Sequence, residues 1–428
     1  MGEPLLVAAV GLIGAAWLCV AVAASPRLIL YLLFALCPTQ FLFVPVSNFF
    51  ISPADVLLAG STAGLVLRLA SGQMRAWRSL YQHRFLILML VSYGVGFVIL
   101  DVFSRTIVRL PMAMLVSVLA CDLLRTRRHL ARAATALVIA GALDAAYGLF
   151  FIARGTPLHQ TRFSGMSDVN FAAMMIATSA AIAFAQLART RRPWRLLRPA
   201  ALGGVALATL SQMGVLAIAA AWVTVLRRIA SRLNRVRVVS TLLLLIGVAV
   251  LASPVRDRVL NRTVREVQPD GVARNSTDIR WLIMGAAWQG FVANPVIGLG
   301  FFKFAEFSNR DPAISAISGG LGYPTHNSYL EVLVEGGLVA LVLFMLHWWQ
   351  YLGAFPRAIG RAVREHDSLT AACLVGCPIM IVCAALANVL LLYGFWAVSG
   401  LALACLNLHR QEDAAGHDKA GRTGELQE

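Results

Sequence analysis

Charged side chains are scarce in this chain of 428 residues. They make up 14% of it, whereas hydrophobic residues make up 59%. A soluble globular protein carries roughly 25% charged residues, so the composition excludes an ordinary soluble enzyme. Backbone polar groups inside a bilayer must be satisfied internally, which favours helices. The sequence therefore predicts an all-α polytopic membrane protein.

Lysine is almost absent, because only Lys303 and Lys419 stand among the 37 basic residues. The arginines give a formal net charge of +16, which is compatible with nucleic-acid binding. However, most of them gather in short loops between apolar runs, as they do in membrane proteins. No basic run interleaved with aromatic residues lies outside those loops. We therefore predict contact with membrane lipids and no nucleic-acid partner.

Motifs for bound cofactors are missing as well. All seven cysteines lie inside apolar runs, without a CxxC motif or a Cys/His cluster. Cys373 and Cys377 share a helix face, an arrangement more typical of packing than of a metal site. The sequence also lacks an Asp-x-Asp pair that stands out as a metal-ligand set and a Gly-rich nucleotide loop. It predicts no disulfide, no metal and no cofactor.

Apolar runs approach the length that a bilayer-spanning helix needs, about 20 residues. The sequence predicts 12 or 13 transmembrane helices, at residues 5–24, 28–46, 54–70, 85–100, 107–124, 133–153, 171–188, 199–210, 213–226, 238–252, 328–350, 369–388 and 390–408. The first run lacks a basic leader and is followed by further spans, so we interpret it as a transmembrane helix rather than a cleaved signal peptide.

The distribution of arginine predicts the orientation. Every second short loop is strongly basic, following the runs that end near residues 70, 124, 188, 226 and 350. Such loops stay in the cytoplasm. The alternate segments, residues 101–106, 154–170 and 255–327, then face outward. We predict four regions: N-terminal transmembrane helices at 1–254, an external loop with a surface helix at 255–327, C-terminal transmembrane helices at 328–408, and a disordered cytoplasmic tail at 409–428.

The external loop at residues 255–327 is the one long polar interval, and any chemistry is expected there. Apolar positions at helical spacing predict a helix over 278–292, beginning near Thr277 or Asp278 and stopped by Asn294 and Pro295. We expect this helix to lie on the membrane surface or across the mouth of the bundle. Glycines beyond it mark irregular backbone, and the aromatic residues argue against disorder.

His326 opens the span that follows, in YPTHNSYLEVLVEGGL. It either caps that helix or acts as a general base, since imidazole titrates near neutral pH. Thr325, Asn327 and Ser328 provide capping groups without it. Ionisable residues inside a span are functional candidates by default, and Glu331 and Glu335 share a face there. Glu335 with the following two glycines could instead form a packing kink.

Arg280 stands among apolar neighbours on the external side, where arginine is uncommon. It either pairs with Asp278 or Glu266, or holds a phosphate through paired hydrogen bonds. Arg162, in HQTRFSGMSDVNFAAM, is a second external arginine in an unusual setting. Weaker candidates for binding the diphosphate or the acceptor are Arg265, Arg274, Lys303, Glu331, Asn327 and Tyr329.

An external site has no access to cytoplasmic ATP or nucleotide sugars. Group transfer there needs an energised lipid carrier, and a polyprenyl diphosphate-linked glycan meets this requirement. Its diphosphate is a good leaving group once arginines neutralise the developing charge.

NPVIGLGFFKF followed by THNSYLEVLVEGGLVALVLF resembles the O-antigen ligase family of membrane glycosyltransferases. The shared pattern is an arginine-bearing helix, an N/H-P-x-x-G-x-G turn, a variable loop, H-N-x-x-L opening a span, and Glu-Gly-Gly. TRFSGMSDVNFAA resembles an upstream motif of that family. The resemblance covers residues 161–344. Gln212 stands where relatives often carry an arginine, so we assign no role there.

The resemblance implies a metal-independent, inverting transfer on the periplasmic face of the bacterial inner membrane. A glycan would pass from undecaprenyl diphosphate to a hydroxyl of the lipid A–core oligosaccharide. Arg162 and Arg280 would hold the diphosphate, and His326 would orient or deprotonate the acceptor. Alternatives are an O-antigen or exopolysaccharide polymerase with the same donor, glycosylation of proteins, and a transporter of a lipid or an anionic solute.

Overall fold

The computed structural model describes residues 25–41, 44–46, 49–100, 109–154, 169–187, 202–203, 205, 266–267, 273–274, 276–365, 367–385 and 389–424. These residues are predominantly helical, which confirms the predicted helical class in outline. The main helices are α2 (Pro26–Leu36), α3 (Pro53–Ala70), α4 (Met74–Gln82), α5 (Arg84–Leu100), α6 (Arg109–Leu123), α7 (Arg127–Ala153), α8 (Val169–Leu187), α13 (Ser276–Ala293), α14 (Phe304–Ser308), α15 (Pro312–Ser318), α16 (Ser328–Leu352), α17 (Ala354–Arg364), α18 (Ser368–Cys383) and α19 (Tyr393–Gly424).

Two short antiparallel ladders accompany the helices. Strand β1 (Val44–Val46) pairs with β2 (Phe49–Ile51), and β3 (Glu266–Val267) pairs with β4 (Ala273–Arg274). Both are local hairpins, so they leave the helical layers intact.

Three helices in the described part are long and apolar enough to cross a membrane: α3, the stretch Arg127–Phe150 of α7, and the stretch Ser328–Ala362 that begins with α16. Helices α4 and α5 qualify together as a fourth, with a bend of 68° between them. The predicted count of 12 or 13 spans stays a prediction. The predicted spans at 5–24, 199–210, 213–226 and 238–252 lie wholly or mostly outside the described residues.

The predicted span at residues 28–46 is wrong as a single helix. Helix α2 ends at Leu36, a 3-10 helix follows over Cys37–Phe41, and β1 begins at Val44. Pro38 accounts for the break, because proline lacks the N–H that an α-helix needs and clashes with the preceding turn. The hydropathy of this segment indicates an apolar run, but it contains no information on where the helix ends.

The predicted disordered tail differs from the structure too. Helix α19 continues to Gly424, well beyond residue 408. Its first polar turns are held in place, because the guanidinium of Arg127 donates two hydrogen bonds to the carboxylate of Glu412, at 3.0 and 2.9 Å. Arg127 also donates to Asp367 at 2.7 Å. This arginine therefore joins the start of α7 to the tail and to the beginning of α18.

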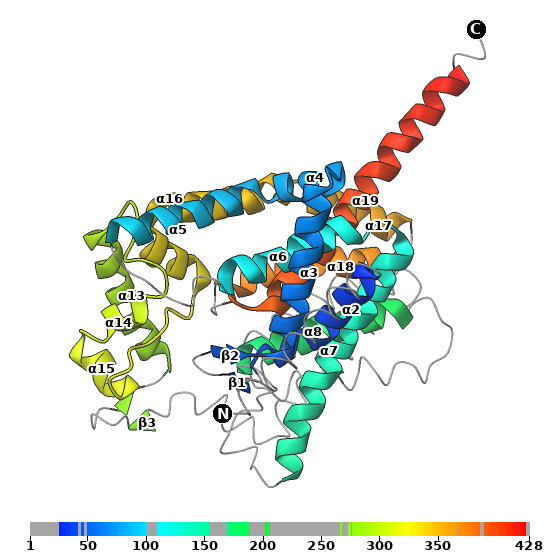
Figure 1. Ribbon diagram of the computed structural model, residues 1–428. Helices are drawn as coiled ribbons and strands as arrows, with labels where there is room; N and C mark the ends of the chain where they lie inside the picture. Colours follow the sequence, from blue (N-terminus) through cyan, green and yellow to red (C-terminus); the bar gives the residue numbers. More distant parts are fainter. Residues whose placement is uncertain are drawn as a thin grey trace, which may run out of the picture.

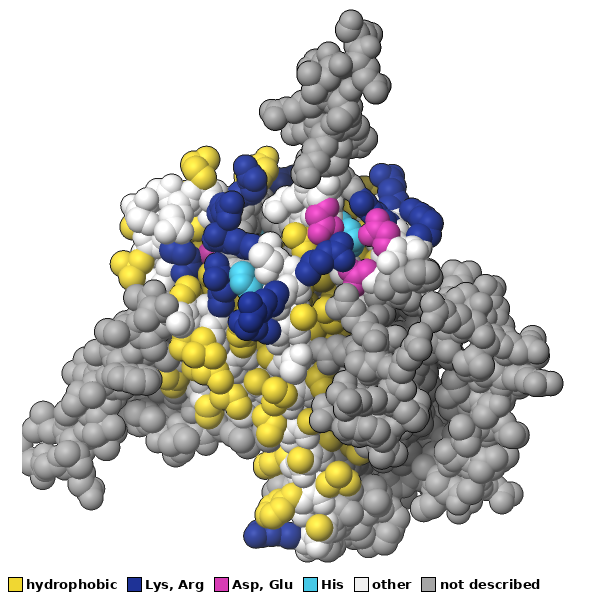
Figure 2. Space-filling model, turned by 90° about the vertical axis from the view of Figure 1, so that its right-hand side faces the viewer, with side chains coloured by type: hydrophobic (Ala, Val, Ile, Leu, Met, Phe, Trp, Pro, Cys, Tyr) yellow, Lys and Arg dark blue, Asp and Glu magenta, His cyan; other side chains and the backbone are white. Residues whose placement is uncertain are grey.

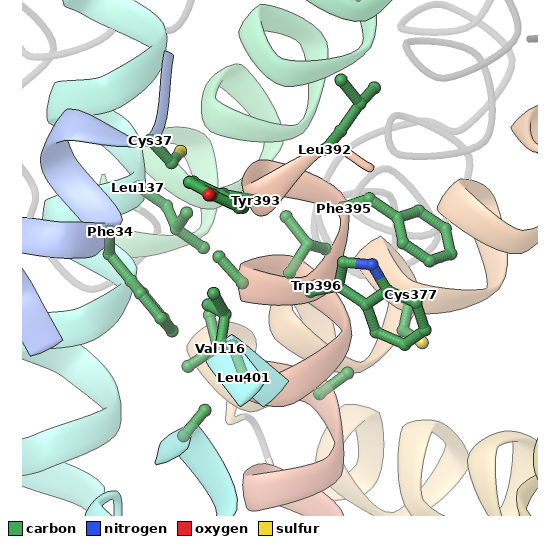
Figure 3. Packing of buried hydrophobic residues seen from close by; sticks show 14 of the residues in the cluster. Phe34, Cys37, Val116, Leu137, Cys377, Leu392, Tyr393, Phe395, Trp396 and Leu401 are labelled. Atoms are coloured by element: carbon green, nitrogen blue, oxygen red, sulfur yellow. The ribbon is translucent and has the colours of Figure 1, made fainter. Parts of the chain in front are cut away.

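The main core lies where α19 packs against α6 and α18, with α2 and α7 beside them. Figure 3 shows Trp396 and Tyr393 of α19 among Phe34, Leu137 and Val116, which come from α2, α7 and α6. Small residues permit this close packing: a side chain added at Gly400 of α19 would come within 2.7 Å of α6. The core holds these helices together as one bundle.

The two ends of the molecule differ in character. Helices α4 and α17 and the end of α19 lie at one end, whereas α13, α14 and α15 lie at the other (Figure 1). Figure 2 shows the side of the molecule that lies on the right in Figure 1. Basic side chains gather there in a band above a surface of hydrophobic side chains. The predicted orientation, in which the basic loops share one face of the membrane and the α13–α15 region occupies the opposite face, stays a prediction.

Candidate active site

Helix α13 ends where the sequence predicts. It covers Ser276–Ala293, and Asn294 and Pro295 follow directly. Its inner side packs Ile283, Ala286 and Ala287 into a small second core, which also contains residues of α14, α15 and α16. Helix α13 is thus packed against α14, α15 and α16.

Arg280 lies on the second turn of α13 and is half-buried. Within the described part of the chain, no hydrogen bond or ion pair to its guanidinium is found. The side chains of Asp278 and Glu266, its predicted ion-pair partners, lie outside the described residues. Next to it, Ile279 packs against the second core. Arg280 therefore offers hydrogen-bond donors at the edge of a fixed element.

The NPVIGLGFF turn after α13 is joined to α16 by backbone hydrogen bonds. Leu299 N–H donates to the carbonyl of Val334 at 2.9 Å, and Gly300 N–H donates to that of Glu335 at 3.0 Å. In the opposite direction, Leu338 N–H donates to the carbonyl of Pro295 at 2.8 Å. These bonds are possible because α16 is kinked at Gly337, where φ is 70° and ψ is −173°. The turn and the kink form one interlocked unit.

Glycine is required on both sides of this joint. A Cβ at Gly298 would come within 2.4 Å of the backbone of Glu335, and one at Gly337 within 2.1 Å of the carbonyl oxygen of Val296. Both residues also have a positive φ angle, which residues other than glycine rarely adopt. One glycine of the turn motif, Gly298, and one of the Glu-Gly-Gly motif, Gly337, are therefore explained by a single contact.

Glu335 completes the joint. Its carboxyl group is buried and accepts hydrogen bonds from the backbone N–H groups of Phe302 at 2.8 Å and Phe304 at 3.2 Å. These donors offset the cost of burying the group. Phe302 is held with a φ of 61°. The interpretation of Glu335, Gly336 and Gly337 as a packing kink is therefore confirmed, and Glu335 holds the turn on α16.

The loop between α15 and α16 carries the chain to His326. Gly319, Gly320 and Gly322 all have positive φ. The hydroxyl of Ser308 in α14 accepts a hydrogen bond from Tyr323 N–H at 3.0 Å, which fixes the loop just before the histidine. Tyr323 also packs on the second core. The loop is thus irregular in backbone but anchored at its end.

His326 precedes α16 rather than capping it. Its φ is 51°, a left-handed conformation that is uncommon outside glycine. The cap is Asn327, whose side chain accepts hydrogen bonds from Tyr329 N–H at 3.0 Å and Leu330 N–H at 3.1 Å. The imidazole is half-buried, and its ring centroid lies 5.9 Å from that of Tyr323. The cap of α16 is therefore supplied by Asn327 and not by His326.

The start of α16 is fixed from the other side by the connection between α18 and α19. Ser328 N–H donates to the carbonyl of Ala384 at 2.8 Å, and its hydroxyl accepts from Val389 N–H at 2.9 Å. The hydroxyl of Tyr329 donates to the carbonyl of Ile381 at 2.7 Å. Asn327 and Tyr329, which the sequence suggested as substrate contacts, thus carry structural hydrogen bonds that place His326.

Of the remaining predicted site residues, the structure describes Glu331 and Lys303. Glu331 is half-buried on α16, one turn before Glu335. Lys303 donates to the exposed carboxylate of Glu306 at 2.8 Å, and this hydrogen bond lowers the pKa of Glu306. Arg162 and Arg265 lie outside the described residues, as does the side chain of Arg274 in β4.

No sequence motif marks Tyr93, which lies on α5. Its ring is 3% exposed and meets Phe301 edge to face at 5.3 Å. A Cβ at Gly336 would approach this ring to 2.8 Å. Gly96, one turn further along α5, faces the carbonyl oxygen of Ile297. Helix α5 therefore supports the interlocked unit from the side opposite α13, through contacts distant in sequence.

Residues 199–345 match the family model for O-antigen ligase, and this match covers about a third of the chain. This part of the chain is similar to the O-antigen ligase family. The matched region contains α13, the interlocked turn, His326 and the kink of α16, whereas Arg162 and Tyr93 lie outside it. The family supports a glycosyltransferase function of the ligase or polymerase type. No curated protein matches the chain.

Proposed function

We propose that this protein transfers a glycan from undecaprenyl diphosphate to a hydroxyl of the lipid A–core oligosaccharide. The reaction would take place on the periplasmic face of the bacterial inner membrane. One observation carries this proposal beyond the similarity to that family. The interlocked turn joins α13, which bears Arg280, to the kink of α16, and His326 directly precedes the start of α16. The proposed anion-binding group and the proposed proton acceptor therefore belong to two elements that are fixed to each other.

Arg280 would bind the diphosphate of the donor. A guanidinium presents paired N–H donors in a plane that matches phosphate oxygens. Because these donors are not used by any described residue, they are available to a ligand. Arg162, in the second external segment, is proposed to complete the clamp. Arg265, Arg274 and Lys303 would add positive charge around it.

The chemical step would be a substitution at the anomeric carbon. The acceptor oxygen forms a bond to that carbon while the bond from carbon to phosphate oxygen breaks. The electron pair leaves with the diphosphate, whose added negative charge the arginines stabilise. The proton of the acceptor hydroxyl passes to His326. Attack in line with the departing diphosphate inverts the anomeric configuration.

The fixed position of His326 supports this assignment. A general base must lie within hydrogen-bond reach of the proton that it takes, so the base needs a constrained backbone. Asn327, Ser328 and Tyr329 supply that constraint through their hydrogen bonds to α16, α18 and the connection to α19. The left-handed backbone of His326 sets its direction relative to the helix.

Deleting the gene and analysing the surface glycan tests the proposal. Loss of a ligase leaves polymerised glycan on the lipid carrier, whereas loss of a polymerase leaves single repeat units there. Full-length protein with purified lipid-linked donor and lipid A–core acceptor is the second arm. Transfer to the acceptor is expected. A system in which the glycan neither lengthens nor changes its attachment would overturn the proposal and favour transport.

A further inference from the structure

Helix α13 has a second apolar face that points away from the protein. Trp281, Trp288 and Val292 are 64%, 58% and 59% exposed, and Met284 lies between them. Since an α-helix turns about 100° per residue, these four positions fall on one stripe. The opposite side of the helix packs into the second core. A helix that is apolar on both sides needs an apolar environment on its outer side as well.

The stripe continues into the exposed surface of a candidate membrane span. Beyond the end of α13, Val296 is exposed and belongs to the turn that is joined to α16. Leu338, whose N–H bonds to the carbonyl of Pro295, is exposed directly beside that turn. From there the exposed apolar residues of α16 run along the span Ser328–Ala362. The exposed apolar residues of α16 therefore continue through Leu338 and Val296 to the stripe on α13.

The residue types of the stripe favour the boundary between lipid headgroups and acyl chains over the acyl interior. Two of its members are tryptophans, which gather where an apolar ring can be buried while the indole N–H stays near water. Gln289, one position after Trp288, is also exposed and lies about 100° further around the helix. The helix thus has an apolar stripe bordered by a polar edge.

We propose that the Trp281–Val292 stripe of α13 lies in the outer headgroup–acyl boundary of the bilayer, with the helix parallel to the membrane surface. Arg280 is at the border between this stripe and the buried face, one turn before Met284. Its guanidinium then sits at the depth of lipid phosphates. A lipid-linked substrate would reach it by diffusing in the membrane plane. The placement of α13 itself does not depend on the proposed glycan transfer.

Nitroxide labels on the full-length protein test this placement. The variants Met284→Cys, Trp288→Cys and Val292→Cys sample the stripe, and Gln289→Cys is the matched control on the same helix. Each labelled protein is reconstituted in vesicles of phosphatidylcholine and phosphatidylglycerol. Collision with oxygen, which concentrates in lipid, is compared with collision with a water-soluble nickel chelate. Unsubstituted protein gives the background from native thiols, of which those described are buried or half-buried.

Oxygen collisions are expected to exceed nickel collisions at the three stripe positions, and the order is expected to reverse at Gln289. Nickel dominating at all four positions would overturn the proposal, because α13 would then lie in water. Oxygen dominating at all four would also overturn it, since the helix would be immersed. Spin–spin broadening that disappears on dilution with unlabelled protein would show that a second copy covers the stripe. Measuring at three stripe positions guards against one variant that misfolds.

Discussion

The backbone of His326 is held in a left-handed conformation directly before α16, whose cap is the next residue, Asn327. Asn327 caps α16, and Ser328 and Tyr329 anchor the helix start to α18 and the segment after it. A left-handed backbone at a residue other than glycine costs free energy, which the surrounding hydrogen bonds must offset. Such conformations often mark functional sites, and here the marked residue is the proposed base.

Replacing His326 with alanine is expected to lower glycan transfer by roughly 10²- to 10⁴-fold, the usual contribution of a general base. The cap at Asn327 stays intact, so membrane insertion and the thermal midpoint should change little. Transfer is measured with purified lipid-linked donor. His326→Gln serves as the comparison, because it keeps a polar side chain without a titratable nitrogen. Transfer at the normal rate in both variants would exclude the histidine from the chemistry.

The substitution Arg280→Lys keeps the charge and removes the planar pair of donors. Hydrogen bonds to charged groups contribute about 1.5–3 kcal/mol, so a loss of roughly 10- to 100-fold in kcat/KM is expected. Arg310→Lys is the control, because Arg310 is exposed and stacks on Phe307 of the neighbouring α14. Equal kinetics for the Arg280 variant and the unsubstituted protein would rule out the diphosphate clamp.

At the scale of elements, the joint between the NPVIGLGFF turn and the kink of α16 decides how α13 sits. Backbone hydrogen bonds run in both directions across it, and Glu335 adds two more. Helix α5 closes the other side through Tyr93 and Gly96. Disturbing this joint should therefore affect folding and activity together, unlike the changes at His326 and Arg280.

Gly298→Ala is expected to destabilise the protein by at least about 1–2 kcal/mol, the cost of forcing a side chain into a left-handed conformation. The clash with the backbone of Glu335 adds to this cost. Thermal unfolding in detergent is the measurement. Gly285→Ala on α13 is the matched control, because nothing lies within 4 Å of its added Cβ. In a helix that change should be neutral or slightly stabilising. Equal midpoints for the two variants would contradict the interlocked joint.

Glu335→Gln tests the carboxyl group of the joint. Glutamine keeps one acceptor oxygen but places an NH2 group against one of the two backbone donors. Leaving a buried donor unsatisfied costs about 1–3 kcal/mol. We expect a lower thermal midpoint and faster proteolysis at residues 301–304. Glu306→Gln is the control, since Glu306 is exposed. A variant at Glu335 that is fully stable but inactive would instead indicate a direct role in catalysis.

Local features of these elements were predictable from the sequence, and the joint was not. Asn327 is a strong capping residue, and Asn294–Pro295 stops a helix, so both boundaries follow from nearby residues. The joint connects backbone groups more than 30 residues apart, and Tyr93 reaches it from α5. Such contacts produce no periodic pattern in the hydropathy of the sequence, so they could not be predicted from it. The break at Pro38 was visible in the sequence, but the surrounding apolar run masked it.

At the scale of the whole molecule, the basic helices and the α13–α15 region lie at opposite ends (Figure 1). The predicted orientation places α4 and α17 in the cytoplasm and α13–α15 outside. Arg310 and Arg357 are exposed and belong to these two ends. They are therefore suitable positions for a measurement of sidedness.

Arg310→Cys is expected to react with a membrane-impermeant maleimide added to spheroplasts, whereas Arg357→Cys should react only after the membrane is opened. The positive-inside distribution of arginine is the physical reason. Unsubstituted protein under both conditions gives the background. Labelling of Arg357→Cys in sealed spheroplasts, with no reaction of Arg310→Cys, would reverse the orientation and place the site on the cytoplasmic side.

Three hydrogen bonds of the joint, donated by Leu299, Gly300 and Leu338, run between main-chain atoms only. Any side chain at Val296, Ile297 or Leu299 that suits its own surroundings leaves those hydrogen bonds unchanged. Substitutions there can reshape the surface at the end of α13 while the hydrogen bonds that join the turn to α16 are preserved. In such a scaffold, main-chain bonds position the elements that bear the proposed catalytic residues, whereas other side chains determine which substrate is bound. It allows a change of sugar or acceptor without rebuilding the catalytic geometry.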